Sequence, residues 1–350
     1  MKTIVKQVVG IDVAQHELVV QLGRMYDDWS PELYASKTFP NTTKGFQALV
    51  AWVSKLTDDQ AVVRYVMEAT GVYHESLAYY LDENGQPVSI VLPNKISSYA
   101  RSLDTKTVTD ATASNAITLF GLERQLRQWS RPKGIFRKLK QLTRERSQLV
   151  EERTALKNQL HAEQAEAQPY KKSIDRMKKR INLLDQQEKE IQDELKILIQ
   201  TDPEMKRAVE LLCSISGIGT LTVATVLGET NGFDLIGNKR QLTSYAGLDI
   251  QEKQSGTSVK GKPRISKRGN KHLRKAMHMP ALAAIRHDQR YKAVFARLVS
   301  KHGIKMKAAV AVQRKLLEMM FTIFKKQEKY DKEYFKRFAA DPVDNCLEKN

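Results

Sequence analysis

The sequence has 350 residues, which is enough for two or three domains that each bury a core. Its 41% hydrophobic content excludes a chain disordered throughout, and no apolar run reaches the roughly 18 residues of a membrane helix. The two cysteines, Cys213 and Cys346, lie far apart, which excludes a disulfide framework or a cysteine-based zinc cluster. The 58 Lys and Arg against 40 Asp and Glu give a net charge of +18, which predicts a polyanionic partner.

The basic residues are unevenly distributed along the chain. No acidic residue occurs between Glu252 and Asp288, and this interval is typical of a surface that faces phosphates. The alternative is a generally basic, solvated surface with no specific partner. The interval contains ten lysines and arginines: Lys253, Lys260, Lys262, Arg264, Lys267, Arg268, Lys271, Arg274, Lys275 and Arg286.

The first 125 residues or so alternate strand and helix signals. Runs of β-branched and apolar residues predict strands over residues 5–13, 17–22, 61–67 and 87–92. Helices are expected after a turn and cap at residues 40–44, from Gly71 through Leu81, and from Asp110 through Phe120. Together these elements predict an α/β domain built on one mixed sheet.

Two long helices are expected next. Leucines at three- and four-residue steps from Leu139 to Leu160, and a second apolar series from Ile174 to Leu198, follow the heptad spacing of a coiled coil. Arg146 and Arg153 interrupt the first seam and Glu188 interrupts the second. The helices would fold back on each other or pair with another subunit; the alternative is two amphipathic helices packed on a globular core.

The next segment is predicted to form two helices joined by a turn. The first helix is capped at Asp202, the turn contains Gly217 and Gly219, and the second helix covers residues 221–229. Such a helix-hairpin-helix element can aim backbone N–H groups at a nucleic-acid phosphate, whereas a plain helical corner explains the same residues. Residues 273–324 are predicted to be mostly helical, and the tail from Lys325 to be polar and frayed.

Three carboxylates stand at the ends of predicted elements. Asp12 and Glu68 lie where two strands end, and Asp110 lies where a helix begins. Carboxylates at one edge of a sheet can hold divalent metal ions. Taken singly, each has an ordinary structural explanation: a turn for Asp12, a cap partner for Glu68 and an N-cap for Asp110.

Over nearly its whole length the chain resembles the DEDD-type insertion-sequence transposases, relatives of the Piv DNA invertases, several of which are bridge-RNA-guided recombinases. The residues that carry the resemblance are Gly10-Ile11-Asp12-Val13, Glu68-Ala69-Thr70-Gly71-Val72-Tyr73, Thr109-Asp110, Ile215-Ser216-Gly217-Ile218-Gly219, Tyr245-Ala246-Gly247-Leu248, Ser255-Gly256 and Ile265-Ser266-Lys267-Arg268-Gly269-Asn270.

The resemblance implies an α/β N-terminal RuvC-like (RNase H-type) domain over residues 1–130 and a long coiled-coil insertion over 131–200. A mostly α C-terminal transposase domain with the helix-hairpin-helix element follows over 201–330, and a polar tail over 331–350. It also implies that Asp12, Glu68 and Asp110 hold Mg²⁺ or Mn²⁺. The family's fourth acidic position is occupied by Ala113, so at least one metal site is expected to be weaker, with Asp104 or Asn115 as alternative oxygen donors.

Ser255 matches the family's nucleophilic serine, which attacks a DNA phosphate and forms a phosphoserine link. A hydroxyl beside a glycine and many cations suits this chemistry, because charge on the phosphate must be neutralised during attack. Without the family, a Ser-Gly pair is a loop turn, and Ser258 and Ser266 lie nearby. The residues expected to contact nucleic acid are Gly217, Gly219, Lys260, Lys262, Arg264, Lys267, Arg268, Lys271 and Arg274.

These residues predict an RNA-guided DNA recombinase of a mobile element. It would act on donor and target DNA with a guide RNA, as a homodimer or homotetramer. Two other functions are kept open: a catalytically decayed nucleic-acid-binding relative, and a metal-dependent junction nuclease in which the serine is incidental. The N-terminal segment lacks a signal-peptide cleavage site, so we expect a cytoplasmic, nucleoid-associated bacterial protein without a membrane partner.

Overall fold

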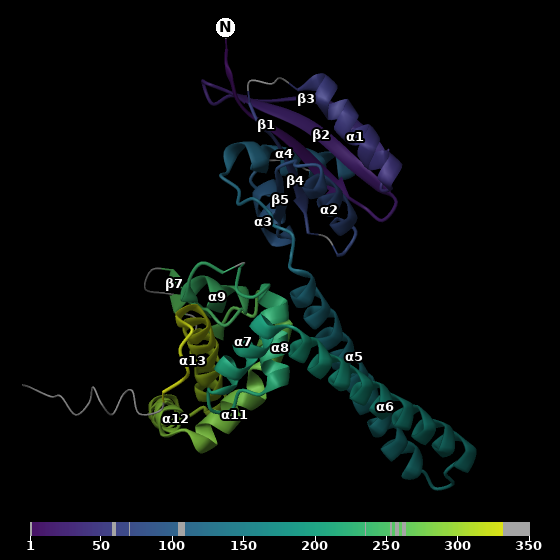
Figure 1. The fold of residues 1–350 in the computed structure, drawn as a ribbon, viewed down its shortest axis with the longest axis vertical. Coiled ribbons are helices and arrows are strands. Elements are labelled where there is room, and N and C mark those ends of the chain that lie inside the picture. Colours follow the sequence, from purple (N-terminus) through teal and green to yellow (C-terminus); the bar gives the residue numbers. More distant parts are fainter. Residues whose placement is uncertain are drawn as a thin grey trace, which may run out of the picture. The chain divides into compact units, whose positions relative to one another are not determined.

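In the computed structural model, the described residues are 2–57, 61–69, 71–103, 109–234, 236–252, 254–255, 259–260 and 264–331. The chain divides into two compact units, residues 1–131 and 132–350, which are described separately (Figure 1).

The first unit is built on a five-stranded mixed sheet with strand order β3-β2-β1-β4-β5. β1 (Ile4–Val13), β2 (Glu17–Tyr26) and β3 (Pro31–Pro40) form an antiparallel meander, and β4 (Val63–Glu68) and β5 (Val88–Val91) run parallel to β1. The sequence did not predict β3. It is an edge strand with a proline at each end and mostly half-exposed residues, so it lacks the apolar alternation that identifies a strand.

Helices cover both faces of this sheet. α1 (Thr43–Leu56) and α2 (Glu75–Glu83) supply Phe46, Leu49 and Leu77 to a core that also contains Val9 and Ile11 of β1. α3 (Pro93–Ala100) and α4 (Asp110–Glu123) cover the opposite face, where a second core contains Val8, Val66, Ile96, Ile117 and Leu122. These two layers of helices around a mixed sheet agree with the RNase H-type fold that the resemblance implies.

Two helix starts differ from the prediction. α2 begins at Glu75 rather than at Gly71, because Gly71 has φ +61° and residues 71–74 form a turn. α3 was missed, since Pro93 was interpreted as the end of β5; Pro93 instead occupies the first turn of the helix, where a proline needs no N–H partner.

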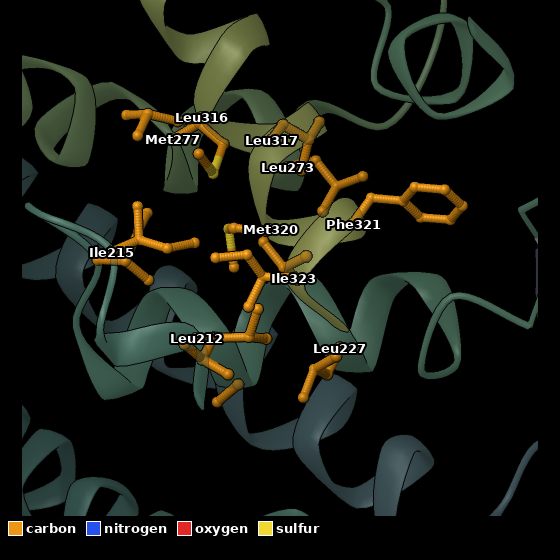
Figure 2. Packing of buried hydrophobic residues seen from close by; sticks show 14 of the residues in the cluster. Leu212, Ile215, Leu227, Leu273, Met277, Leu316, Leu317, Met320, Phe321 and Ile323 are labelled. Atoms are coloured by element: carbon orange, nitrogen blue, oxygen red, sulfur yellow. The ribbon is translucent and has the colours of Figure 1, made fainter. Parts of the chain in front are cut away.

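The second unit is mostly helical. Its helices are α5 (Gly134–Gln164), α6 (Lys171–Thr201), α7 (Pro203–Cys213), α8 (Thr220–Thr230), α9 (Lys239–Tyr245), α10 (Lys271–Ala276), α11 (His278–His287), α12 (Gln289–His302) and α13 (Lys305–Lys326). Figure 2 shows their shared core, in which Leu212 of α7, Leu227 of α8, Leu273 of α10 and Met320 of α13 are each fully buried. α13 ends at Lys326, one residue after the predicted start of the polar tail; residues 332–350 lie outside the described part of the chain.

α5 and α6 pack against each other as a hairpin (Figure 1), with Leu156, Ile181 and Leu184 in a small core of their own. The three charged residues that interrupt the heptads pair across this seam. Glu188 is buried, and its carboxylate accepts hydrogen bonds from Nη2 of Arg146 at 2.5 Å and from Nη1 of Arg153. These residues are therefore complementary partners across the seam rather than defects in it.

The turn between α7 and α8 contains the two predicted glycines. Gly217 has φ +88°, and a Cβ there would lie 2.6 Å from the carbonyl oxygen of Pro280 and 3.0 Å from the amide nitrogen of Ala284 on α11. Gly217 is thus required for packing within the unit. Gly219 is the exposed N-cap of α8, and a Cβ at this position would meet open space among the described atoms.

Candidate functional site

Asp12 and Glu68 lie on neighbouring parallel strands and on the same face of the sheet. Ile11 of β1 pairs with Met67 of β4, so the next residue on each strand is one of these two carboxylates. Ile11 and Met67 point into the core under α1 and α2. Because side chains alternate along a strand, Asp12 and Glu68 point to the opposite face, which α4 covers. Both carboxylates are half-buried.

α4 lies very close to β1, and Gly10 makes this possible. A Cβ on Gly10 would lie 2.1 Å from Oγ1 of Thr118 and 2.8 Å from the carbonyl oxygen of Ser114. Further along the same helix, a Cβ on Gly121 would lie 2.7 Å from Cγ1 of Val8. α4 therefore runs antiparallel to β1, and its first turn, with Asp110, is directed toward the Asp12 end of the strand.

A capping box fixes the start of α4. Oγ1 of Thr109 accepts a hydrogen bond from the Thr112 amide at 3.3 Å, and Oγ1 of Thr112 accepts one from the Thr109 amide at 2.8 Å. Thr109 is thus the N-cap, and the structural explanation that made Asp110 the cap is wrong. Asp110 occupies the first helical position and is exposed.

The three carboxylates interact electrostatically. The pKa of Asp12 is raised, first by burial and then by the negative charges of Asp110 and Glu68. Among the residues that the structure describes, no three His, Cys, Asp or Glu side chains lie close enough together to hold a metal ion. The three carboxylates thus interact through their charges without being gathered into a closed metal site, and a divalent cation would relieve the repulsion on Asp12.

Ala113 lies one turn after Asp110 on α4 and is half-buried. Residues three apart on a helix are neighbours on its surface, so a longer side chain at this position would share a face with Asp110. Of the two alternative oxygen donors, Asn115 is a half-buried residue of α4, and Asp104 lies outside the described residues.

The backbone around Ser255 forms a nested hairpin in the second unit. β6 (Ile250–Gln251) pairs with β9 (Arg264–Ile265), and further toward the tip β7 (Gln254–Ser255) pairs with β8 (Val259–Lys260). Closer to the base, the Lys267 amide donates to the Gly247 carbonyl at 3.1 Å and the Asn270 amide donates to the Tyr245 carbonyl at 2.7 Å. The two arms thus begin at Tyr245 and Asn270, and Ser255 lies near the tip.

Two glycines and one arginine hold the arms together at this base. A Cβ on Gly269 would lie 2.5 Å from the Tyr245 carbonyl oxygen, and Gly247 has φ +67°. Nη1 of Arg274 donates to the carbonyl of Ala246 at 2.8 Å on one arm and to that of Gly269 at 3.1 Å on the other. The structure gives Arg274 this bridging role; its contact with nucleic acid stays a prediction.

The other predicted basic residues lie on or near the same hairpin. Arg264, Lys267, Arg268 and Lys271 are exposed, and Lys267 adopts φ +53°. Lys260 is placed by its backbone in β8, and Lys262 lies outside the described residues. The exposed cations suit contact with a phosphate backbone.

The sequence did not point to a basic cavity beside the hairpin base. It has a volume of about 710 Å³ and is lined by residues of α5, α8, α10 and α11. Arg144, Arg146, Arg274 and Lys275 line it, and among the described residues Glu229 is the one acidic side chain on its wall. Arg146 had been noted only as a heptad interruption. Its seam position is explained by Glu188, so the sequence carried no signal for this cavity.

Two family models match the chain. One, described as "Transposase" and built on the DEDD-type IS110 proteins, matches residues 9–165, which include Asp12, Glu68 and Asp110. The other, described as "Transposase IS116/IS110/IS902 family", matches residues 209–296, which include Ser255. The chain belongs to the IS110 family of transposases. This transposase is thus an enzyme that recombines DNA.

Individual relatives agree with this assignment. The transposase is 28% identical over 335 residues to the pilin gene-inverting protein of Moraxella bovis, which covers 93% of this chain and 98% of that protein. It is 27% identical over 115 residues to an IS110 uncharacterized 43.6 kDa protein of Streptomyces coelicolor, covering 33% of this chain and 28% of that one.

Part of the chain also resembles a solved structure, the T. thermophilus RuvC in complex with a Holliday junction substrate. This likeness covers 35% of the transposase and 99% of the RuvC chain, with a TM-score of 0.27 and 10% identity. A likeness this weak carries no weight, and the strand order itself supports the fold. Across the described residues, no helix is long and apolar enough to span a membrane.

Proposed function

We propose that this transposase cuts and rejoins DNA by using Ser255 as a nucleophile, with a divalent metal ion at Asp12, Glu68 and Asp110. The single observation that carries the proposal is the arrangement of these carboxylates: Asp12 and Glu68 end neighbouring strands on the face that α4 covers, and the pKa of Asp12 is raised first by burial and then by the charges of Asp110 and Glu68. Repulsion of this kind favours binding of a hard cation such as Mg²⁺ or Mn²⁺.

The metal, when bound, would neutralise charge on the phosphate under attack. The chain's own residues supply the rest of the chemistry. The Ser255 hydroxyl gives up its proton as Oγ forms a bond to the phosphorus, the phosphorus–oxygen bond of the DNA strand breaks, and the leaving oxygen gains one proton to become a strand-end hydroxyl, so the proton count is unchanged. Attack by a hydroxyl of a second strand on the phosphoserine reverses these changes and rejoins the DNA.

The basic residues of the hairpin would hold the flanking phosphates. The exposed residues Arg264, Lys267, Arg268 and Lys271 lie on the second arm of the hairpin or directly after it in the sequence. Phosphate contacts fix position and carry no sequence information. Choice of sequence would therefore come from base pairing with a guide RNA, which rests on the family resemblance alone. The association of two or more subunits that strand exchange requires stays a prediction, because the apolar heptad positions of α5 and α6 pack against each other within one chain.

The test is a search for a protein–DNA adduct that resists SDS. The full chain is incubated with Mg²⁺, a duplex carrying the DNA that flanks its coding sequence, and RNA transcribed from the same flanks. We expect an adduct with the wild type and with Ser258→Ala, and none with Ser255→Ala.

Other outcomes distinguish the alternative functions. Strand cleavage that persists in Ser255→Ala without any adduct would favour a metal-dependent junction nuclease. Binding of DNA and RNA without cleavage by the wild type would favour a decayed binding protein, and Ala113→Asp would then test whether the missing carboxylate is the cause.

A further inference from the structure

Glu229 lies at the end of α8 and contacts both arms of the hairpin that carries Ser255. Its side chain is 1% exposed, although a carboxylate is rarely buried so fully unless it has partners. It has no counterpart among the acidic residues that the family resemblance assigns to the metal site, and it lies in the other unit.

Both carboxylate oxygens of Glu229 accept hydrogen bonds. Its Oε1 accepts from Nε of Arg144 at 2.6 Å, and its Oε2 accepts from Nη2 of Arg144 at 2.9 Å and from Nδ2 of Asn270 at 2.6 Å. Its backbone carbonyl accepts from the hydroxyl of Tyr245 at 3.0 Å. The pKa of Glu229 is lowered even against the opposing effect of burial, because Arg144 and Asn270 stabilise the ionised form.

The two hairpin residues that contact Glu229, Tyr245 and Asn270, form the first hydrogen-bonded pair at the base of the hairpin. The Asn270 amide donates to the Tyr245 carbonyl, so both arms start from a single point on α8. Asn270 also caps α10, since its Oδ1 accepts from the amides of His272 and Leu273. Arg144 belongs to α5, which connects the same point to the long helical hairpin.

We infer that Glu229 is a positioning residue for strand cleavage: it fixes the base of the hairpin on α8 and α5 and thereby sets where Ser255 stands relative to the phosphate. The inference rests on the proposed role of Ser255. It assigns no contact with DNA to Glu229, whose carboxylate faces Arg144 and Asn270. A shift of about 1 Å in a reacting group can cost on the order of a hundredfold in rate.

The principal test is Asn270→Asp in the full chain. An aspartate keeps the cap of α10 but cannot donate to Glu229, and two carboxylates would then face each other. We expect the rate of adduct formation at saturating DNA to fall by about tenfold or more while the Kd for DNA changes little. The matched control is Asn238→Asp, the same change at the cap of α9, which should leave the rate unchanged.

Two further variants separate positioning from loss of folding. Tyr245→Phe removes one hydroxyl at nearly constant volume and should lower the rate by a smaller factor. The double variant Glu229→Gln with Asn270→Asp exchanges donor and acceptor, because the glutamine amide can donate to the aspartate while its oxygen still accepts from Arg144. This double variant should recover part of the rate lost in Asn270→Asp.

A fall in DNA binding and in adduct formation by the same factor, or no rescue in the double variant, would overturn the inference. If the wild type forms no adduct, the proposed role of Ser255 fails, and hydrogen exchange then decides about Glu229. The amides of Lys267 and Asn270 should exchange about tenfold faster in Asn270→Asp, as expected for one lost hydrogen bond. Unchanged exchange would show that Glu229 does not hold the hairpin base.

Discussion

Gly10 of β1 lies directly against Thr118 of α4, so closely that a Cβ on Gly10 would come within 2.1 Å of the threonine Oγ1. Thr118 is fully buried, and its hydroxyl donates to the carbonyls of Ser114 and Gln21. It therefore cannot move away at low cost. The glycine two residues before Asp12 sets the distance between the strand that bears Asp12 and the helix that bears Asp110.

Gly10→Ala should displace α4 from the sheet. We expect a loss of about 1–3 kcal/mol in the free energy of unfolding of the first unit, as for overpacking of a filled core. All three tryptophans, Trp29, Trp52 and Trp129, lie in this unit, so its unfolding can be followed by tryptophan fluorescence in the full chain. Gly134→Ala in the second unit, where an added Cβ meets no other described atom, controls for a general effect of the substitution and should leave this fluorescence transition unchanged; an equal shift in both variants would contradict the account.

Asp12→Asn should stabilise the first unit near neutral pH in the absence of metal. The pKa of Asp12 is raised in the folded state, so its ionisation costs stability as the pH rises through the folded pKa. The gain in Tm from Asp12→Asn should therefore be present at pH 7 and vanish below the unfolded pKa of about 3.9. Added Mg²⁺ should raise the Tm of the wild type and not that of the variant.

Asp28→Asn provides a control of opposite sign in the same unit. Lys2 and Ser30 bond to the Asp28 carboxylate and lower its pKa, so its stabilising effect is present above the unfolded pKa and is lost as the pH falls. This variant should be less stable than the wild type at pH 7 and should respond to Mg²⁺ as the wild type does. An identical response of both variants would argue against a metal site at Asp12.

Glu188→Gln should destabilise the α5–α6 hairpin. The variant leaves Arg146 and Arg153 without their shared carboxylate, and we expect the free energy of unfolding to fall by about 2–3 kcal/mol. This loss is smaller than the usual value for fully buried pairs because both arginines are partly exposed. Far-UV circular dichroism should show earlier loss of helix, whereas tryptophan fluorescence should be unchanged. Asp193→Asn, at an exposed pair with Lys196 on α6, should have little effect; the opposite ranking would contradict the pairing.

The sequence predicted most of the fold, and its failures have identifiable causes. Strands rich in β-branched and apolar residues, such as residues 5–13, were predicted, whereas the edge strand β3 has no such pattern. The heptads predicted two long helices, but the spacing of residues within each helix cannot show that Arg146 and Glu188 face each other across the seam. Complementarity of this kind depends on the register of two helices and is settled only when they pack.

The candidate site was predicted in part for the same reason. Asp12 and Glu68 each follow a run of buried strand residues, so the sequence predicted their place at strand ends. The sheet register then brings them together. Glu229 carried no such signal, because its importance depends on Arg144 and Asn270, which are 85 and 41 residues away in sequence. Long-range polar partners of this kind are invisible to local patterns.

The measurement that tests the account most directly is mass spectrometry of the adduct after nuclease and trypsin digestion. Cleavage after Lys253 and Lys260 releases a peptide of residues 254–260, in which fragmentation separates Ser255 from Thr257 and Ser258. The account predicts a nucleotide remnant on Ser255 that requires Mg²⁺ and is absent from Asp12→Asn. A remnant on another residue, or one on Ser255 whose yield is the same in Asp12→Asn and in the presence of a chelator, would contradict it.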